Sequence, residues 1–431
     1  MRRITSTRPR TAVFTAVVAL SLAFAGCRGG STTSSGGGGT KTNAGAPTAT
    51  VGFDGTTISV GAISPQTGIA SIIGLVLTDG NRVFFDALNA RGGIAGKYKV
   101  NLEVRDSQYN SNVAQQNYAD LRDKVVMLAQ LLGTDITNAV LTPMRQDNMI
   151  AAPATLDAQW VRNPNLLPVA APYQIQAING LTHYVNQGGG AGKTVCVIRA
   201  DDLYGQAGFD GVDYASKHLN FKLGKVVQFG AAETDLTAQL QQVKTGCDAV
   251  FLVSLPTVTI PLMAQASSQN VNVRWIGQAP TWVSLLASGA TGAYMQQHYW
   301  LASQGPQWGD TAVPGMKQML DDIARFKPGQ KPDIYFAFGY AQALTVSKLL
   351  EKAVALGDLS RVGVMKALNQ LGDVDTLGLA GVYHYGPPAS RVPPRISTIF
   401  SVDPAASQIG GLRAINTNFE SDPARQFPFP K

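Results

Sequence analysis

Histidine and cysteine are scarce in this chain of 431 residues, which has only four histidines and three cysteines. No two histidines stand three or four residues apart, and no group of cysteines or carboxylates has the spacing of metal ligands. The segment 187–194 resembles a phosphate loop, but it starts with glutamine instead of glycine and enters a predicted strand instead of a helix. A G-x-S-x-G motif is also missing. The sequence therefore predicts a protein with no metal, no cofactor and no hydrolase chemistry.

Charge of one sign is not concentrated anywhere in the chain. The formal net charge is +7, but Arg2, Arg3, Arg8 and Arg10 lie in the first ten residues, and without them the charge is only +3. Runs of basic residues with interleaved aromatic residues are absent. This composition argues against a nucleic-acid partner.

No apolar run of the sequence is long enough to cross a membrane, which takes roughly 20 residues. The four arginines are followed by an uncharged stretch from Thr11 to Gly26, and this arrangement is typical of an export signal. Phe24, Ala25, Gly26 and Cys27 resemble a lipobox, in which the cysteine is acylated and becomes the mature N-terminus. We therefore expect a signal peptide at 1–26 and a lipidated Cys27; an ordinary cleaved signal with an unmodified cysteine is the alternative.

Residues 27–56 are rich in glycine, serine and threonine and have almost no bulky apolar side chains. Such a segment cannot bury enough surface to offset its ordering entropy, so it is expected to be a flexible tether. With a lipid at its start, it would hold the remainder of the chain on the outer face of the cytoplasmic membrane, in the cell envelope or periplasm.

The stretch from Thr57 to Asp106 predicts a complete βαβ unit. A short apolar strand at 58–63 leads into a polar loop, Ser64–Gly68, and the spacing of apolar residues from Leu75 to Ala90 is that of an amphipathic helix. A glycine-rich turn then leads to a strand at Lys99–Asp106. This pattern is typical of an open, doubly wound sheet, where ligands bind at the carboxyl ends of the strands.

The same alternation continues along the chain and restarts near residue 172. We expect further strands at 125–131, 149–152, 193–199, 225–229, 248–253, 273–277, 382–385 and 396–402. We expect helices at 111–124, 137–148, 174–187, 205–219, 235–245, 258–270, 313–326, 334–356 and 359–370, and an irregular tail from Asn416. The predicted fold class is therefore α/β, with two doubly wound parallel-sheet lobes in tandem.

The run DALNARGGIAGKYKVNLEVRD at 86–106 resembles a signature of the substrate-binding proteins of branched-chain amino acid ABC transporters. The resemblance continues through Asp202–Gln206, Asp235–Leu240 and Gly246–Val250. It implies a type I periplasmic-binding-protein clamshell whose lobes are joined by a three-segment hinge. On this basis lobe 1 would comprise 57–171 and 305–380, lobe 2 would comprise 172–304 and 381–412, and 413–431 would be a tail.

The resemblance also implies a function. The chain would be a monomeric solute-binding lipoprotein that captures a small polar ligand, such as an amino acid, an amide or a small carboxylate, and delivers it to an ABC permease. A clamshell sensor that reports ligand to a membrane receptor is the alternative. An enzyme is disfavoured, because Asp201 and Asp202 are better explained as a turn that caps the next helix than as paired catalytic carboxylates.

The family's site maps onto short polar turns at the strand ends. Both lobes would contribute ligand contacts from turns at their strand ends, and the long helix at 334–356 would add Phe338 or Tyr335. The predicted ligand-binding residues are Gln66, Thr67, Thr134, Asp135, Ala154, Thr155, Tyr204, Leu255, Pro256, Gln278, Ala279, Trp282 and Phe338. The family's amino-acid binders carry a glutamate for the ligand's ammonium near Gln278 and Ala279, where this chain has no acid. Unless Asp135 substitutes for it, an amino acid is in doubt as the ligand.

Cys196 and Cys247 lie on or beside predicted strands that should be neighbours in one sheet. In an oxidising compartment such a pair is able to form a disulfide. Two buried free thiols are the favoured interpretation, and the disulfide is the alternative.

Overall fold

The computed structural model describes residues 45–430 except 231, 232 and 234. The predicted signal peptide, Cys27 and most of the tether lie outside the described residues. Within 45–430, apart from those three positions, no helix is both long enough and apolar enough to cross a membrane.

The first lobe is built on a four-stranded sheet with the order β2-β1-β3-β4, in which every pairing is parallel. Strands β1, β3 and β4 are almost entirely buried, as expected for parallel strands covered by helices, whereas the edge strand β2 is mostly half-buried. Its strands are β1 (Thr57–Ser64), β2 (Lys99–Asp106), β3 (Met127–Leu132) and β4 (Ala151–Ala154). The helices that follow the strands are α1 (Ser71–Ala90), α2 (Ser111–Leu121), α3 (Thr134–Gln146) and the short η1 (Ala158–Trp160).

The second lobe has a seven-stranded sheet with the order β13-β12-β9-β8-β7-β5-β6. The run from β9 to β6 is parallel, and β12 and β13 extend it as antiparallel strands. Its strands are β5 (Thr194–Ala200), β6 (Lys222–Phe229), β7 (Ala249–Val253), β8 (Arg274–Gln278), β9 (Tyr299–Ser303), β12 (Ser397–Val402) and β13 (Leu412–Phe419). Its helices are α4 (Tyr173–Gln187), α5 (Leu203–His218), α6 (Thr237–Val243), α7 (Pro256–Ser268), α8 (Gly289–His298), and the short η2 (Ala279–Thr281), η3 (Ser284–Ala287) and η5 (Ser407–Ile409).

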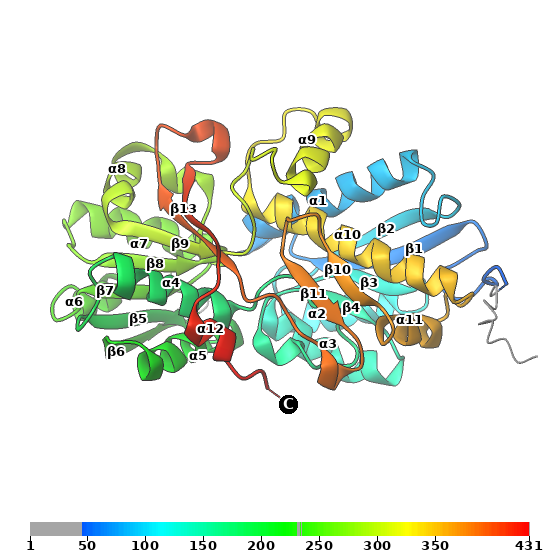
Figure 1. The fold of residues 1–431 in the computed structure, drawn as a ribbon, viewed down its shortest axis with the longest axis horizontal. Coiled ribbons are helices and arrows are strands. Elements are labelled where there is room, and N and C mark those ends of the chain that lie inside the picture. The colour runs from blue at the N-terminus through cyan, green and yellow to red at the C-terminus, as the bar shows by residue number, and fades with distance from the viewer. Residues whose placement is uncertain (1–44, 231–232, 234, 431) are drawn as a thin grey trace, which may run out of the picture. The chain divides into compact units, whose positions relative to one another are not determined.

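Three later helices return to the first lobe: α9 (Pro314–Phe326), α10 (Ile334–Ala355) and α11 (Arg361–Leu368). In Figure 1 the long α10 lies along α1, far from α1 in the sequence. The two helices cross at Gly80 and Gly339, where a Cβ would lie only 2.3 Å from the Phe336 carbonyl oxygen and 2.1 Å from that of Leu77, respectively. The chain therefore passes between the lobes three times, and the predicted two-lobe α/β fold is confirmed.

A separate antiparallel pair joins β10 (Gly372–Asp375) to β11 (Val382–Tyr385), and the short η4 (Pro388–Ser390) follows it. The hydroxyl of Tyr385 donates to the Pro168 carbonyl at 2.6 Å, and Arg391 donates to carbonyls of the 163–166 segment. The predicted change of lobe at residue 381 falls inside this pair. We propose instead that the third crossing lies beyond Arg391.

The prediction of an irregular tail from Asn416 is wrong. Strand β13 continues to Phe419 along β12, and α12 (Asp422–Gln426) follows it. The side-chain oxygen of Asn179 in α4 accepts both the backbone N–H and the hydroxyl of Ser421, at 3.0 and 2.8 Å. These bonds attach the end of the chain to the second lobe.

Cys196 in β5 and Cys247, two residues before β7, form a disulfide with their Cα atoms 5.8 Å apart. The favoured prediction of two free thiols is therefore wrong. Strands β5 and β7 are direct parallel neighbours, so the two cysteines approach each other at the same end of the sheet. Gly224 in β6 leaves room for the bridge, because a Cβ there would lie 2.7 Å from the Cys196 sulfur.

Candidate ligand-binding cavity

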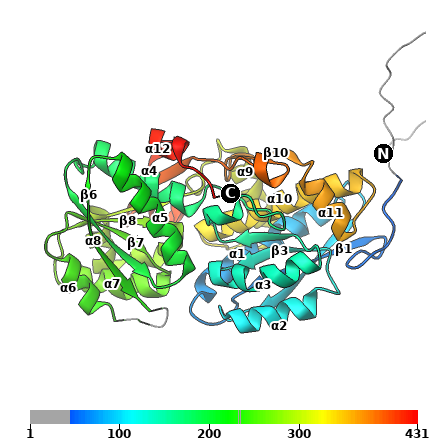
Figure 2. The same ribbon diagram turned by 90° about the horizontal axis from the view of Figure 1, so that it is seen from below.

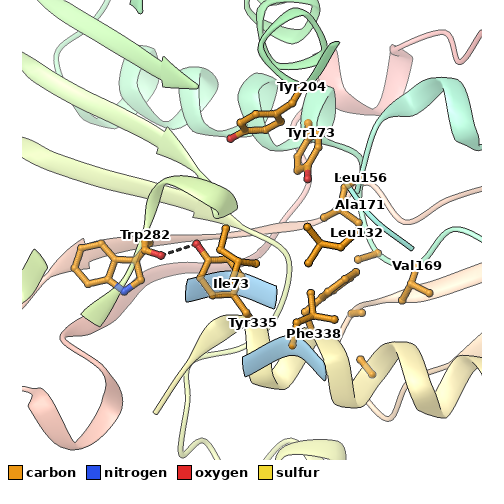
Figure 3. Close-up of a cluster of buried hydrophobic side chains, with 14 of the residues drawn as sticks. Ile73, Leu132, Leu156, Val169, Ala171, Tyr173, Tyr204, Trp282, Tyr335 and Phe338 are labelled. Carbon is orange, nitrogen blue, oxygen red and sulfur yellow. Dashed lines mark hydrogen bonds between the residues drawn. The ribbon is translucent and has the colours of Figure 1, made fainter. Parts of the chain in front are cut away.

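A cavity that is partly open to solvent lies where the carboxyl ends of the strands of the two sheets face each other. Figure 3 shows the side chains that converge there: Leu132 and Leu156 from the first lobe, Tyr173 and Tyr204 from the second, and Tyr335 and Phe338 from α10. The lining residues are Ile73, Leu77, Tyr109, Leu132, Gly133, Thr134, Ala154, Thr155, Leu156, Tyr173, Tyr204, Leu255, Ala279, Pro280, Gln304, Tyr335 and Phe338.

Seven of the predicted contacts meet at this cavity: Thr134, Ala154, Thr155, Tyr204, Leu255, Ala279 and Phe338. The hydroxyls of Thr134 and Thr155 are 2.6 Å apart and buried, and one of the two donates to the other. Helix α3 begins at Thr134, where a loop to residue 137 was predicted. Its first-turn N–H groups therefore have no partner within the helix and are suited to a ligand oxygen.

Gln66 and Thr67 do not line the cavity, because Asp106 at the end of β2 holds their loop. Its carboxylate accepts the N–H groups of Gln66 and Thr67, at 2.8 and 3.3 Å, and the Thr67 hydroxyl at 2.6 Å. Burial disfavours the charged Asp106, but the hydrogen bonds from Thr67, Gln108 and Gln66 outweigh it and lower the pKa of this carboxyl. The N–H groups and the hydroxyl that were predicted to bind a ligand are thus already bonded to Asp106.

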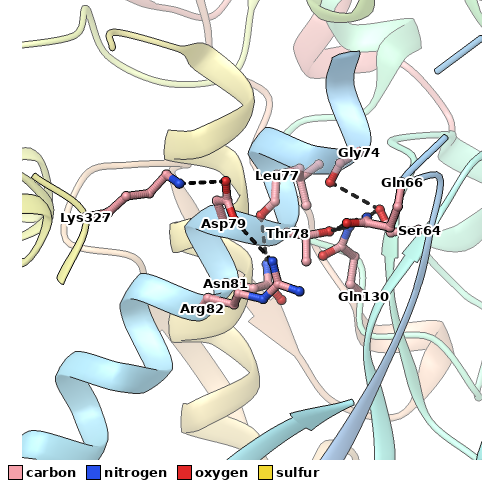
Figure 4. A network of polar contacts seen from close by, with 10 residues as sticks. All are labelled: Ser64, Gln66, Gly74, Leu77, Thr78, Asp79, Asn81, Arg82, Gln130 and Lys327. Atoms are coloured by element: carbon pink, nitrogen blue, oxygen red, sulfur yellow. Dashed lines mark hydrogen bonds and ion pairs between the residues drawn. The ribbon is translucent and has the colours of Figure 1, made fainter. Parts of the chain in front are cut away.

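The Gln66 side chain joins a polar network behind the cavity floor, shown in Figure 4. Its amide nitrogen donates to the Thr78 hydroxyl at 3.2 Å, and the Gln130 amide donates to the hydroxyls of Ser64 and Thr78 at 2.7 and 3.1 Å. Ser64, Thr78 and Gln130 are fully buried. Leu77, next to Thr78 in α1, lines the cavity, whereas Ser64, Thr78 and Gln130 do not.

The second-lobe prediction is only partly reproduced by the cavity. Gln278 is fully buried beside the Tyr204 hydroxyl, with no hydrogen bond of normal geometry from its amide to the described residues. Pro256 is the first residue of α7 and is buried. Trp282 packs against Tyr299, and its carbonyl oxygen accepts the Tyr335 hydroxyl at 2.5 Å. None of these three residues lines the cavity.

Asp135 lies in the first turn of α3 and does not line the cavity either. Its carboxylate lies near the backbone N–H of Leu203, the first residue of α5 in the other lobe. The neighbouring Asp202 caps α5 by accepting the N–H of Gly205 at 2.7 Å. Burial raises the pKa of both carboxyls, and Asp135 also raises that of Asp202. Both carboxyls thus lie at the start of α5.

The sequence analysis missed most of the apolar and aromatic lining. Tyr109 belongs to the loop after β2, where it and Gln108 both have a positive φ, 57° and 52°. Tyr173 is the first residue of α4, and its ring packs edge to face on Tyr204 with centroids 5.1 Å apart. Gln304 directly follows β9, a strand that was not predicted. Without that strand, no pattern in the sequence placed Gln304 at a sheet end.

Among residues 45–430, apart from the three positions left undescribed, no three histidine, cysteine, aspartate or glutamate side chains are arranged to hold a metal. None of the described side chains that line the cavity is charged. The described lining therefore offers shape, apolar surface and a few hydrogen-bonding groups.

Comparison with known proteins identifies the class. A family model described as periplasmic binding protein matches residues 57–393, so the chain belongs to the periplasmic binding protein family. The resemblance found in the sequence is confirmed, and so is the type I fold. The family and its solved members support a role in capturing a ligand for transport.

Several solved structures share the fold at low sequence identity. A fatty acid ABC transporter substrate-binding protein from Thermomonospora curvata has a TM-score of 0.79 and 23% identity, over 88% of this chain and 96% of that chain. A branched-chain amino acid ABC transporter protein from Thermus thermophilus, solved with bound valine, has a TM-score of 0.72 and 16% identity, over 86% and 98%. A leucine-binding protein from Thermotoga maritima has a TM-score of 0.69 and 15% identity, over 84% and 98%.

Proposed function

We propose that this protein captures a small solute between its two lobes outside the cytoplasmic membrane and delivers it to an ABC permease. The observation that carries the proposal is the cavity at the facing strand ends, which takes its lining from both lobes. A ligand that contacts both lobes binds the closed arrangement better than the open one, and this difference shifts the population towards closure. The cycle needs no covalent step, so the ligand leaves unchanged and the protein is not an enzyme.

The proposed ligand has an apolar body and a small polar end. Leucine, isoleucine, phenylalanine and tyrosine side chains form most of the lining, whereas the threonine pair and the start of α3 provide hydrogen-bonding groups. One structural neighbour is described as a fatty acid transporter protein and another was solved with valine. The fold thus serves acids both with and without an ammonium group.

We further propose that residues 1–26 are a signal peptide, that Cys27 is lipidated, and that the tether to residue 56 holds the lobes near a permease. The expected result is incorporation of radiolabelled palmitate into the full chain and its loss in Cys27→Ser. Incorporation that persists in the variant would contradict the assignment of the lipid to Cys27.

The proposal is tested by screening the full chain against a metabolite library for thermal stabilisation and confirming hits by calorimetry. A ligand present at about 100 times its Kd adds roughly 2.7 kcal/mol of stability. Thr155→Val removes a cavity hydroxyl and should weaken binding about fivefold, since a hydrogen bond contributes about 1 kcal/mol. The matched control is Thr417→Val on the exposed face of β13. If no solute stabilises the protein, and solution scattering gives one shape under all of them, the proposal fails.

A further inference from the structure

The orientation of one glutamine amide in the cavity wall indicates the chemistry of the ligand, given the proposed solute capture. Gln304 lines the cavity and two smaller neighbouring hollows, and it is only 7% exposed. Its side-chain oxygen accepts from the Gln176 amide at 3.4 Å and from the Ser303 hydroxyl at 3.3 Å. Its amide nitrogen has no hydrogen-bond partner among the residues that the structure describes.

Backbone groups fix which end of this amide faces which way. The N–H of Ala279 can only donate, and it donates to the Gln176 side-chain oxygen at 3.2 Å. The carbonyl of Ala171 can only accept, and it accepts from the Gln176 side-chain nitrogen at 3.1 Å. The Gln176 amide therefore has one possible orientation, and its nitrogen must meet the oxygen of Gln304. The NH₂ group of Gln304 is left as a donor without a protein acceptor.

The other polar groups of the cavity also favour a ligand that accepts hydrogen bonds. The first-turn N–H groups of α3, at Thr134, are donors, and the Thr134–Thr155 pair uses only one of its two hydroxyl hydrogens internally. The Tyr335 hydroxyl is already bonded to the carbonyls of Ala279 and Trp282.

An ammonium group would find no counter-charge on this wall, because no carboxylate is among the described lining side chains. Nearby acids are occupied elsewhere. Asp202 accepts the N–H of Gly205 at the start of α5, and Asp157 accepts from Gln159 and from the Gln174 amide. A charge closed into an apolar cavity without compensation is strongly disfavoured. An ammonium meets no anion on the described lining, whereas a carboxylate meets the N–H groups at the start of α3.

We propose that the ligand is an apolar carboxylic acid, or its amide, without an ammonium group, and that the Gln304 amide nitrogen donates to its carbonyl oxygen. Gln304 is thereby a specificity-determining residue. Its NH₂ group pairs with an oxygen-bearing end group and offers no acceptor to an ammonium.

The test uses matched pairs that differ only in the amino group: 4-methylpentanoate with leucine, and 3-phenylpropanoate with phenylalanine. Calorimetry on the full chain should show the acid of at least one pair binding at least tenfold more tightly than its amino acid. Gln304→Glu keeps the oxygen that meets Gln176 and replaces the donor with a negative charge, so it should reduce or reverse the preference. Gln307→Glu is the control, because its side-chain oxygen accepts the Ala414 N–H and the residue does not line the cavity.

Three results separate the possible failures. If leucine or phenylalanine binds as tightly as its acid partner, the ligand class is wrong while solute capture stands. An acid preference that is the same in Gln304→Glu and in the parent protein overturns the role of Gln304. If no compound of these pairs or of the wider metabolite library binds, the proposed function fails and this inference fails with it.

Discussion

The disulfide between Cys196 and Cys247 should be a main support of the second lobe. The bond closes a loop of 51 residues, and the chain-entropy model assigns such a loop about 4 kcal/mol of unfolding free energy. In a unit the size of this lobe, the loss of that amount should lower the melting temperature by on the order of 10 °C. Breaking the bond by reduction removes no heavy atom, so it tests the cross-link with both cysteine side chains still present.

The measurement is differential scanning calorimetry of the full chain with and without reductant, beside Cys196→Ala/Cys247→Ala in both conditions. Both cysteines belong to the second lobe, so a separate transition of the first lobe provides an internal control. The variant should melt near the temperature of the reduced parent protein, slightly lower because Cys196 is buried, and reductant should not affect it. If the oxidised and reduced parent proteins melt together, although mass spectrometry shows the bond only in the first, the reasoning is refuted.

Three further predictions concern single side chains. Tyr335→Phe removes a hydrogen bond between α10 and the second lobe, so calorimetry should show ligand affinity reduced about fivefold to tenfold; an unchanged affinity would exclude a part in closure. Asp106→Asn should speed amide exchange at Gln66 and Thr67, and unchanged exchange would contradict this. Because the pKa of Asp106 is lowered in the folded state, its contribution to stability should be present above its ordinary pKa. That contribution should disappear as the pH falls through the lowered pKa. Burial raises the pKa of Asp333 to about 6, so its charge should reduce stability progressively as the pH rises from about 4 to about 6. Asp333→Asn should therefore melt at a higher temperature than the parent protein above pH 6, and this difference should narrow at pH 4. A difference that is the same at both pH values would refute this prediction.

The elements that the sequence predicted well are those whose pattern is local. Strand β2 was predicted with both of its ends, because Lys99–Asp106 alternates and follows a glycine turn. Helix α8 and strand β9 were missed for the opposite reason. Gly289–His298 contains two glycines and little amphipathic spacing, and the short Tyr299–Ser303 becomes a strand through pairing with β8 and β12.

The disulfide illustrates how a correct neighbourhood still leaves the chemistry open. Strand order placed Cys196 and Cys247 on adjacent strands, but a bridge also requires their side chains to point at each other at bonding distance. The absence of a side chain at Gly224, on the opposite neighbour β6, leaves space for the bond. That requirement depends on strand register, which the residue pattern alone did not supply.

In the candidate site, too, the features that depend on local sequence were predicted and those that depend on distant partners were missed. The rule that ligands bind at the carboxyl ends of parallel strands needs only the order of strands and turns, and it selected Thr134, Thr155 and Tyr204, which line one cavity. Whether a particular donor is free for a ligand depends on partners that are distant in the sequence. Asp106 uses the N–H of Gln66 from 40 residues away, which removed that predicted contact.

Gln304 is the opposite of Gln66, because its proposed role depends on a side-chain N–H group that has no acceptor among the described residues. Its orientation follows from Gln176, 128 residues earlier, and Gln176 is in turn fixed by the N–H of Ala279, 103 residues later in the chain. Helix α4, the turn after β8 and the end of β9 must all be in place before this amide nitrogen is left without an acceptor. A residue whose role is defined in this way has no local sequence signal, so the choice between an acid and an amino acid as ligand depends on the packing of three separate segments.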